Sequence, residues 1–198
     1  MERLQTLENF LTRSWDLLFQ AATKRNEPLR NTILSTYDGQ APQSRVIVLR
    51  KVDKQNRNLL FFTDYRSPKV QEIIQHPAVS VLGWHDKRNV QIRMIGQASI
   101  EKDTTSTKSY WEKLNTRGRT SYATTKAPGL PQEAYSTGLP DFWNKTSSPS
   151  ETNIAYENFC LIHVTINLMD CLHLHPEGHE RASFEWKEDK WDMKWLVP

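Results

Sequence analysis

Residues 62–69 have the residue types of an anion-binding site. A strand pattern runs directly into a helix pattern here, and Ser67 is the candidate N-cap. The first turn of a helix presents unpaired N–H groups and the positive end of the helix dipole. Thr63 adds a hydroxyl donor, and Arg66 and Lys69 add positive charge. This pattern favours a site for a phosphate or another anion; the alternative is an ordinary capped helix with two solvated cations.

Two further strands carry polar residues that could reach such a ligand. Arginines bracket an apolar strand at 45–50, and strand alternation places Arg45 and Arg50 on opposite faces. In a second strand, Gln91 and Arg93 share one face, so the Gln91 amide could hydrogen-bond the edge of a planar heterocycle. The alternatives are arginines at the rim of a barrel and a solvated strand face.

Together these segments resemble a known family. The runs are Arg45-Val-Ile-Val-Leu-Arg50, Phe61-Phe-Thr-Asp-Tyr-Arg-Ser-Pro-Lys69 and Asn89-Val-Gln-Ile-Arg-Met-Ile-Gly96. At these separations they are similar to the pyridoxamine 5′-phosphate oxidase superfamily, and the similarity is best over residues 30–100. The resemblance implies an α+β fold that is mainly β, an antiparallel split β-barrel with flanking helices. It also implies FMN as cofactor, a homodimer with FMN at the subunit interface, and a small-molecule substrate.

The resemblance implies a role for each matching position. Its cofactor-binding positions are Arg45, Val46, Ile47, Val48, Arg50, Phe62, Thr63, Arg66, Ser67, Lys69 and Gln91. Arg45 and Lys69 would hold the phosphate, with Ser67 at the helix start. Residues 46–50 would line the flavin ring, and Phe62 and Thr63 would contact it. Gln91 would meet the ring edge from the partner subunit. The positions that would face the substrate are Arg50, Tyr110, His179 and Arg181.

The predicted substrate clamp departs from the family pattern. The family has an arginine just before its phosphate-binding lysine, and here that position is Pro68. Near the C-terminus, the family's Arg-x-His pair is replaced by His179-Glu180-Arg181. The resemblance therefore favours an FMN-dependent oxidoreductase with an altered clamp, and it assigns no catalytic residue. The alternatives are a non-catalytic flavin- or haem-binding protein on the same barrel and a true pyridoxamine 5′-phosphate oxidase.

Three histidines near the C-terminus, His173, His175 and His179, form an H-x-H-x₃-H pattern. On a strand the first two share a face, which would allow two ligands to one metal ion. No cysteine or carboxylate completes a recognisable set, so we expect polar side chains at a strand end and no metal. In the haem alternative, these histidines are the candidates for axial ligands.

The elements that must position these residues follow from hydrophobic periodicity. Apolar residues recur at steps of three and four over 4–24, and from residue 30 the period changes to two. The pattern predicts helices at 4–24, 67–76 and 103–115, the last capped by Asp103, and a long irregular segment at 117–153. The predicted strands are 31–37, 45–50, 59–63, 78–85, 89–100, 159–166, 169–175, 181–186 and 191–196. We expect one FMN-binding split-barrel domain over residues 1–198.

The composition narrows the function classes. The chain has 198 residues, seven glycines, a net charge of +3 and aromatic residues at 10%. Its length and aromatic content should allow it to fold without disulfide bonds or a structural metal ion. No GxGxxG or GxxxxGK[ST] motif occurs, which argues against a Rossmann or P-loop site. The charge is too small to indicate nucleic-acid binding, and no apolar run is long enough for a membrane span. Two cysteines at unrelated spacing favour a reduced, cytoplasmic setting.

Overall fold

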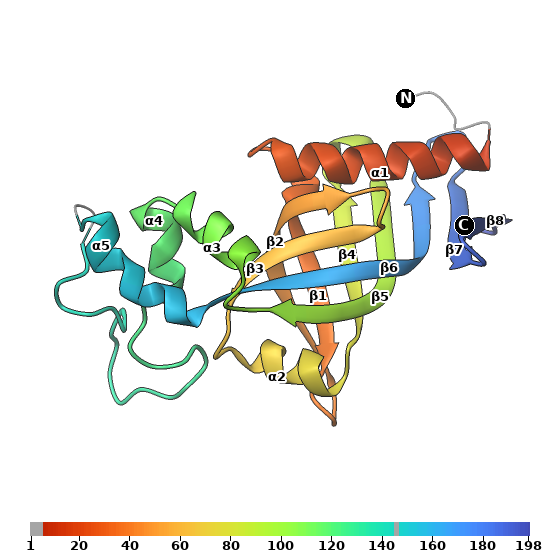
Figure 1. Cartoon of the computed structure of the whole chain (residues 1–198). Coiled ribbons are helices and arrows are strands. Elements are labelled where there is room, and N and C mark those ends of the chain that lie inside the picture. The colour runs from red at the N-terminus through yellow and green to blue at the C-terminus, as the bar shows by residue number, and fades with distance from the viewer. Residues whose placement is uncertain (1–5, 145–146) are drawn as a thin grey trace.

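The computed structural model describes residues 6–144 and 147–198, and a closed antiparallel β-barrel forms its centre (Figure 1). The strands are β1 Asn31–Tyr37, β2 Pro42–Asp53, β3 Asn58–Asp64, β4 Ala78–His85, β5 Val90–Glu101, β6 Phe159–His173, β7 Glu180–Lys187 and β8 Lys190–Leu196. Their order is β3-β2-β1-β4-β5-β6-β7-β8, and an additional β3–β6 pairing closes the first six into a barrel. The predicted split-barrel fold is confirmed.

Strand β6 belongs to both the barrel and the sheet beyond it. Residues 159–165 pair with β3, whereas residues 168–173 pair with β7. The prediction of separate strands at 159–166 and 169–175 is wrong, because Asn167 is the extra residue of a β-bulge opposite Ile95 and Gly96. Gly96 permits this close approach, since a Cβ there would lie 2.2 Å from the Thr165 carbonyl oxygen.

Helix α1 (Leu7–Thr23) lies across one end of the barrel and α2 (Pro68–Gln75) lies at the other (Figure 1). Thr6 caps α1, and the predicted residues 4 and 5 lie outside the described part of the chain. Of the recurring apolar residues of this helix, Trp15 and Leu18 are buried, whereas Leu7 and Leu11 are only partly buried. Phe10 joins the buried face, and the large rings of Phe10 and Trp15 fill the open end of the barrel.

A group of short helices packs against the outside of β3 and β6. It comprises α3 (Thr105–Glu112), α4 (Thr116–Arg119), α5 (Pro149–Thr152) and the 3₁₀ turns Thr120–Tyr122 and Asn153–Asn158. Two further 3₁₀ turns, Pro28–Arg30 and Asp86–Arg88, connect the barrel elements. The predicted cap of α3 is wrong, because Asp103 has a φ of 56° and the cap is Thr104, whose hydroxyl accepts from the Thr107 N–H.

The two faces of β3 therefore enter two different cores. Leu59 and Phe61 point into the barrel, where they join the core that α1 completes. Leu60 and Phe62 point outward, into a second cluster built around Trp111 of α3. This alternation separates the candidate functional residues, because the side chains of neighbouring residues at the end of β3 point to opposite sides of the sheet. Among residues 6–144 and 147–198, no helix is both long and apolar enough to cross a membrane.

Candidate functional site

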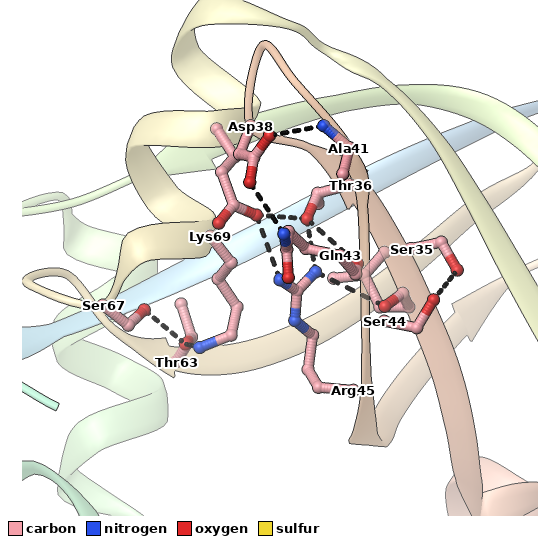
Figure 2. A network of polar contacts seen from close by, with 12 residues as sticks. Ser35, Thr36, Asp38, Ala41, Gln43, Ser44, Arg45, Thr63, Ser67 and Lys69 are labelled. Atoms are coloured by element: carbon pink, nitrogen blue, oxygen red, sulfur yellow. Dashed lines mark hydrogen bonds and ion pairs between the residues drawn. The ribbon is translucent and has the colours of Figure 1, made fainter. Parts of the chain in front are cut away.

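The junction between β3 and α2 brings Thr63, Ser67 and Lys69 together (Figure 2). The Lys69 ammonium donates to Thr63 Oγ1 at 3.2 Å, and the Thr63 and Ser67 hydroxyl oxygens are 3.4 Å apart. Ser67 donates its own proton to the Asp64 carbonyl oxygen at 2.6 Å, so Thr63 is the donor to Ser67. The predicted Ser67 position before α2 is confirmed, but its hydroxyl does not cap the helix.

Lys69 is the half-buried start of this donor chain. Burial lowers its pKa, and the positive charge of Arg45 lowers that pKa further. Within the described residues, no carboxylate lies within ion-pair distance of Lys69, and the Thr63 hydroxyl is its hydrogen-bond partner. A half-buried ammonium with spare donors and no counterion is suited to an anionic ligand.

Arg45 is held beside this group by an ion pair of its own. Its guanidinium donates to Glu72 of α2 at 3.0 Å and to the hydroxyl of Thr36. Glu72 is 8% exposed and also accepts from Thr36. Figure 2 shows the guanidinium turned toward Thr36 while the Lys69 ammonium points at Thr63. Sequence reasoning missed both partners, although Glu72 stands one helical turn after Lys69.

Arg66 serves a different contact. It donates to Asp64 at 2.8 Å and to the Thr124 carbonyl oxygen at 2.9 Å, which joins the helical group to the β3–α2 turn. Three cations, Arg45, Arg66 and Lys69, thus face two carboxylates, Asp64 and Glu72. One positive charge is left in excess at the N-terminal end of α2, where the positive end of the helix dipole adds to it, and this combination favours an anion such as a phosphate.

The outer face of the barrel provides a flat apolar surface. Val46 is 67% exposed and pairs with Ile33, which is 38% exposed; Trp84 on β4 is 44% exposed and lies opposite Gln91. Val48 points the same way as Val46, whereas Ile47 lies in the barrel core, so only the backbone of Ile47 could line a flavin.

Arg50 lies on the other side of β2 from Arg45, as strand alternation predicted. It is the extra residue of a bulge between Leu49 and Lys51. Its guanidinium lies over the Phe62 ring at 5.1 Å, and the rings of Phe62 and Tyr110 are 5.2 Å apart. Burial lowers the pKa of Arg50, and its Nε is buried without a hydrogen-bond partner in the described structure.

Tyr122 completes this second group and was missed by the sequence analysis. Burial raises the pKa of its phenol to about 12, and the nearby charge of Arg50 opposes that rise. Its ring packs on Phe159 at 5.0 Å and on Trp111 at 5.8 Å. Only a loose family match over residues 117–122 pointed to this segment, and hydrophobic periodicity gave no help there.

His179 and Arg181 lie elsewhere. Arg181 on β7 donates to Asp170 at 3.0 and 2.8 Å, and Arg93 donates to the same carboxylate at 2.6 Å. These residues flank the second half of β6, whereas Arg50 and Tyr110 lie by the β3 side. The described chain therefore does not bring His179 and Arg181 together with Arg50 and Tyr110.

The three histidines near the C-terminus lie in different environments. His173 is buried and its Nδ1 lies 3.0 Å from Glu180, whereas His179 is exposed. The His173 and His175 rings are 5.8 Å apart. Within residues 6–144 and 147–198, no group of three or more His, Cys, Asp or Glu side chains has the geometry to hold a metal ion.

Comparison with known proteins bears on the residues around Lys69 and on those around Arg50. Residues 12–102 match the family model described as pyridoxamine 5′-phosphate oxidase, FMN-binding domain. This segment of the chain therefore resembles the FMN-binding domain of that family. Its cofactor is FMN. The residues at the start of α2 fit the cofactor's phosphate, since they present an excess positive charge and free donors.

Curated relatives share part of their length with this chain. A pyridoxine/pyridoxamine 5′-phosphate oxidase of Prochlorococcus marinus is 45% identical over 67 residues, which are 33% of this chain and 29% of that protein. A protein of the same name from Trichormus variabilis is 35% identical over 91 residues, 46% of this chain and 40% of the relative. The chain thus spans less than half the length of these relatives.

Solved structures share the fold over nearly the whole chain. A pyridoxamine 5′-phosphate oxidase-related, FMN binding protein of Nostoc punctiforme superposes with a TM-score of 0.76 at 21% identity and covers 100% of both chains. PhzG of Burkholderia lata, in complex with tetrahydrophenazine-1-carboxylic acid, gives a TM-score of 0.71 at 18% identity and covers 96% of this chain and 91% of its own. The extra strands and helices are therefore part of a fold that these proteins share.

Proposed function

We propose that this chain is an FMN-dependent oxidoreductase that acts on a small molecule, as a single split-barrel domain that works in a homodimer. The observation that carries this proposal is the half-buried Lys69, which has hydroxyl neighbours and no counterion within the described residues. FMN supplies hydride and electron transfer when bound, and the protein supplies its anchoring and surroundings.

In this proposal the phosphate is held at the start of α2. Lys69 donates to it with the protons that Thr63 does not use, and the positive end of the α2 dipole favours its negative charge. Arg45 adds positive charge near the phosphate without donating a hydrogen bond to it, because Glu72 and Thr36 hold its guanidinium in place. Ser67 keeps its proton on Asp64, so its oxygen orients Thr63.

The flavin ring would lie against the outer face of β2, along Val46, Val48 and the backbone of Ile47. Val46 and Ile33 are exposed apolar side chains on paired strands, and Trp84 and Ile95 (44% exposed) continue the surface across β4 and β5. An apolar face of this kind marks an interaction site. A twofold partner would cover it and bring its own Gln91 to the ring edge.

The proposal is tested by the visible spectrum of the purified protein and by its response to added FMN. A bound flavin gives a yellow protein, and a Val46→Glu variant should elute from a sizing column as a monomer with weakened FMN retention. A colourless protein that takes up no FMN would refute flavin binding at this site. Consumption of a reduced nicotinamide donor by the FMN-loaded protein then tests the oxidoreductase activity.

A second candidate is a flavin-binding protein without turnover. It is favoured by the position of Arg181, whose donors are bound to Asp170 rather than directed at the Arg50 group. The two candidates separate in the same assay: a binding protein retains FMN, but it does not oxidise any electron donor at a rate above that of free FMN.

A further inference from the structure

Arg50 is a cation that the described structure leaves without a counterion. No ion pair among residues 6–144 and 147–198 includes it, and its Nε is buried with no hydrogen-bond partner. A guanidinium taken partly out of water is costly unless an anion or a set of acceptors meets it. Arg50 therefore points to an anionic ligand on the helical side of β2, away from the phosphate-binding Lys69.

The surroundings of Arg50 are aromatic and firmly packed. The guanidinium lies 5.1 Å from the Phe62 ring centre, and the Phe62 ring contacts Tyr110 in a tilted arrangement and Phe159 edge-on, each at 5.2 Å. Tyr122 closes the group from the other side through its own contact with Phe159. Flat, rigid walls of this kind favour a planar ring over a flexible chain.

Other cations near this group are directed elsewhere or are solvated. Arg119 is buried against Trp111, with its guanidinium 4.8 Å from the ring, and it donates to Thr152. Lys51 and Lys113 are exposed, and Lys51 shares its pocket with Asp53. An exposed ammonium contributes little to binding because water and salt screen it. Of these cations, Arg50 is the partly buried one whose Nε has no hydrogen-bond partner and which no ion pair among the described residues includes, whereas Arg119 is buried with partners of its own.

We infer that the substrate of this site is a planar aromatic monoanion and that its carboxylate pairs with Arg50. The site should prefer this substrate to an aromatic phosphate monoester. This inference rests on the proposed function. A guanidinium and a carboxylate match in charge and in their paired geometry. A phosphate monoester carries a charge of about −1.5 to −2 at pH 7. Its second charge would be desolvated beside aromatic rings without a partner.

Tyr122 helps set this preference as a positioning residue. With a pKa of about 12, its phenol keeps its proton at neutral pH and can donate to an acceptor bound at Arg50. Tyr110 also lines a pocket of about 330 Å³, together with Lys51, Asp53, Ser106 and His163, among others. That pocket gives room for a polar substituent on the ring, and its mixed charges add no second cationic clamp.

The test uses isothermal titration calorimetry on the FMN-loaded protein with two probes, benzoate and phenyl phosphate, at pH 7.5. We expect benzoate to bind at least about tenfold more tightly than phenyl phosphate. Arg50→Met should abolish benzoate binding while FMN is retained, and Arg50→Lys should weaken it about tenfold, since the charge remains and the planar fork is lost. Lys54→Gln, which alters an exposed cation paired with Asp16, is the matched control and should bind benzoate as the parent does.

The outcomes separate this inference from the proposed function. Tighter binding of phenyl phosphate, binding of neither probe, or an Arg50→Met variant that binds benzoate normally overturns the inference while FMN binding stands. A protein that takes up no FMN overturns the proposed function first. Tyr122→Phe should weaken benzoate several-fold without changing FMN affinity; if it lowers both equally, Tyr122 acts only through folding. Should Arg50→Met fail to fold, Arg50→Lys decides, and unchanged benzoate binding there also overturns the inference.

Discussion

Replacing Lys69 by methionine should weaken FMN binding and stabilise the cofactor-free protein at the same time. Methionine keeps the length of the side chain and removes the ammonium that donates to Thr63 at 3.2 Å. Hydrogen bonds to charged groups contribute about 1.5–3 kcal/mol. At about 1.4 kcal/mol for each factor of ten, losing one such bond raises the Kd for FMN roughly 10- to 150-fold.

The stabilisation of the cofactor-free protein follows from the same burial. Burial lowers the pKa of Lys69 below the usual 10.5, so the unfolded chain binds a proton there more tightly than the folded chain does. The free energy of unfolding of the parent should therefore rise with pH, between the lowered pKa of Lys69 and 10.5. Lys69→Met removes this dependence and the cost of burying the charge, so its melting temperature without FMN should be higher at pH 7.5.

Two measurements check these expectations. Quenching of FMN fluorescence on titration gives the Kd, and thermal unfolding without FMN gives the stability. Lys54→Met is the control, because Lys54 is about half exposed and pairs with Asp16 at 3.4 Å on the surface; neither quantity should change. An unchanged Kd in Lys69→Met would refute the assignment of the phosphate site, and a lower melting temperature would show that Lys69 serves the fold instead.

Three further outcomes follow from other parts of the structure. Gly96→Ala should lower the free energy of unfolding by about 3 kcal/mol in urea titrations, because its Cβ would meet the Thr165 carbonyl oxygen at 2.2 Å; an unchanged stability, or the gain of about 0.5–1 kcal/mol that Gly→Ala ordinarily gives in a strand, would contradict the close approach. His85 has a pKa lowered by burial, so stability should fall as pH drops below about 6.5, and His85→Phe should flatten that slope in thermal scans. Arg66→Ala should speed proteolysis near Thr124, because it removes the hydrogen bonds that hold this loop; an unchanged cleavage rate would show that other contacts hold it.

The barrel was predictable because its strands obey one local rule. Alternation in 31–37 and 78–85 gave β1 and β4 with their observed bounds, and the Ser67-Pro68 pair placed the start of α2. The same rule put Arg45 and Arg50 on opposite sides, which the structure confirms. Periodicity predicted the wrong strand boundary where tertiary contacts override it. At Asn167 the sequence suggests a turn, but a β-bulge lets one strand continue through this position.

The site was predictable only in part. Thr63, Ser67 and Lys69 are neighbours in sequence, so their meeting at one helix end follows from local structure. Tyr122 and Thr124 reach the site from a segment without periodicity, and only packing against β3 and Phe159 brings them there. The partners of a charged side chain are equally non-local, which is why Glu72 and Asp170 were not foreseen.

The closure of the barrel has a consequence for the order of folding. β3 pairs with β6 across about a hundred residues of chain, and such distant contacts form late because the intervening loop must first be ordered. Thr63 lies on β3, so one wall of the phosphate site is fixed only when β6 arrives. On the ribosome, β6 emerges after all the helices and the first five strands. We therefore expect a growing chain to gain affinity for FMN only after β6 has emerged.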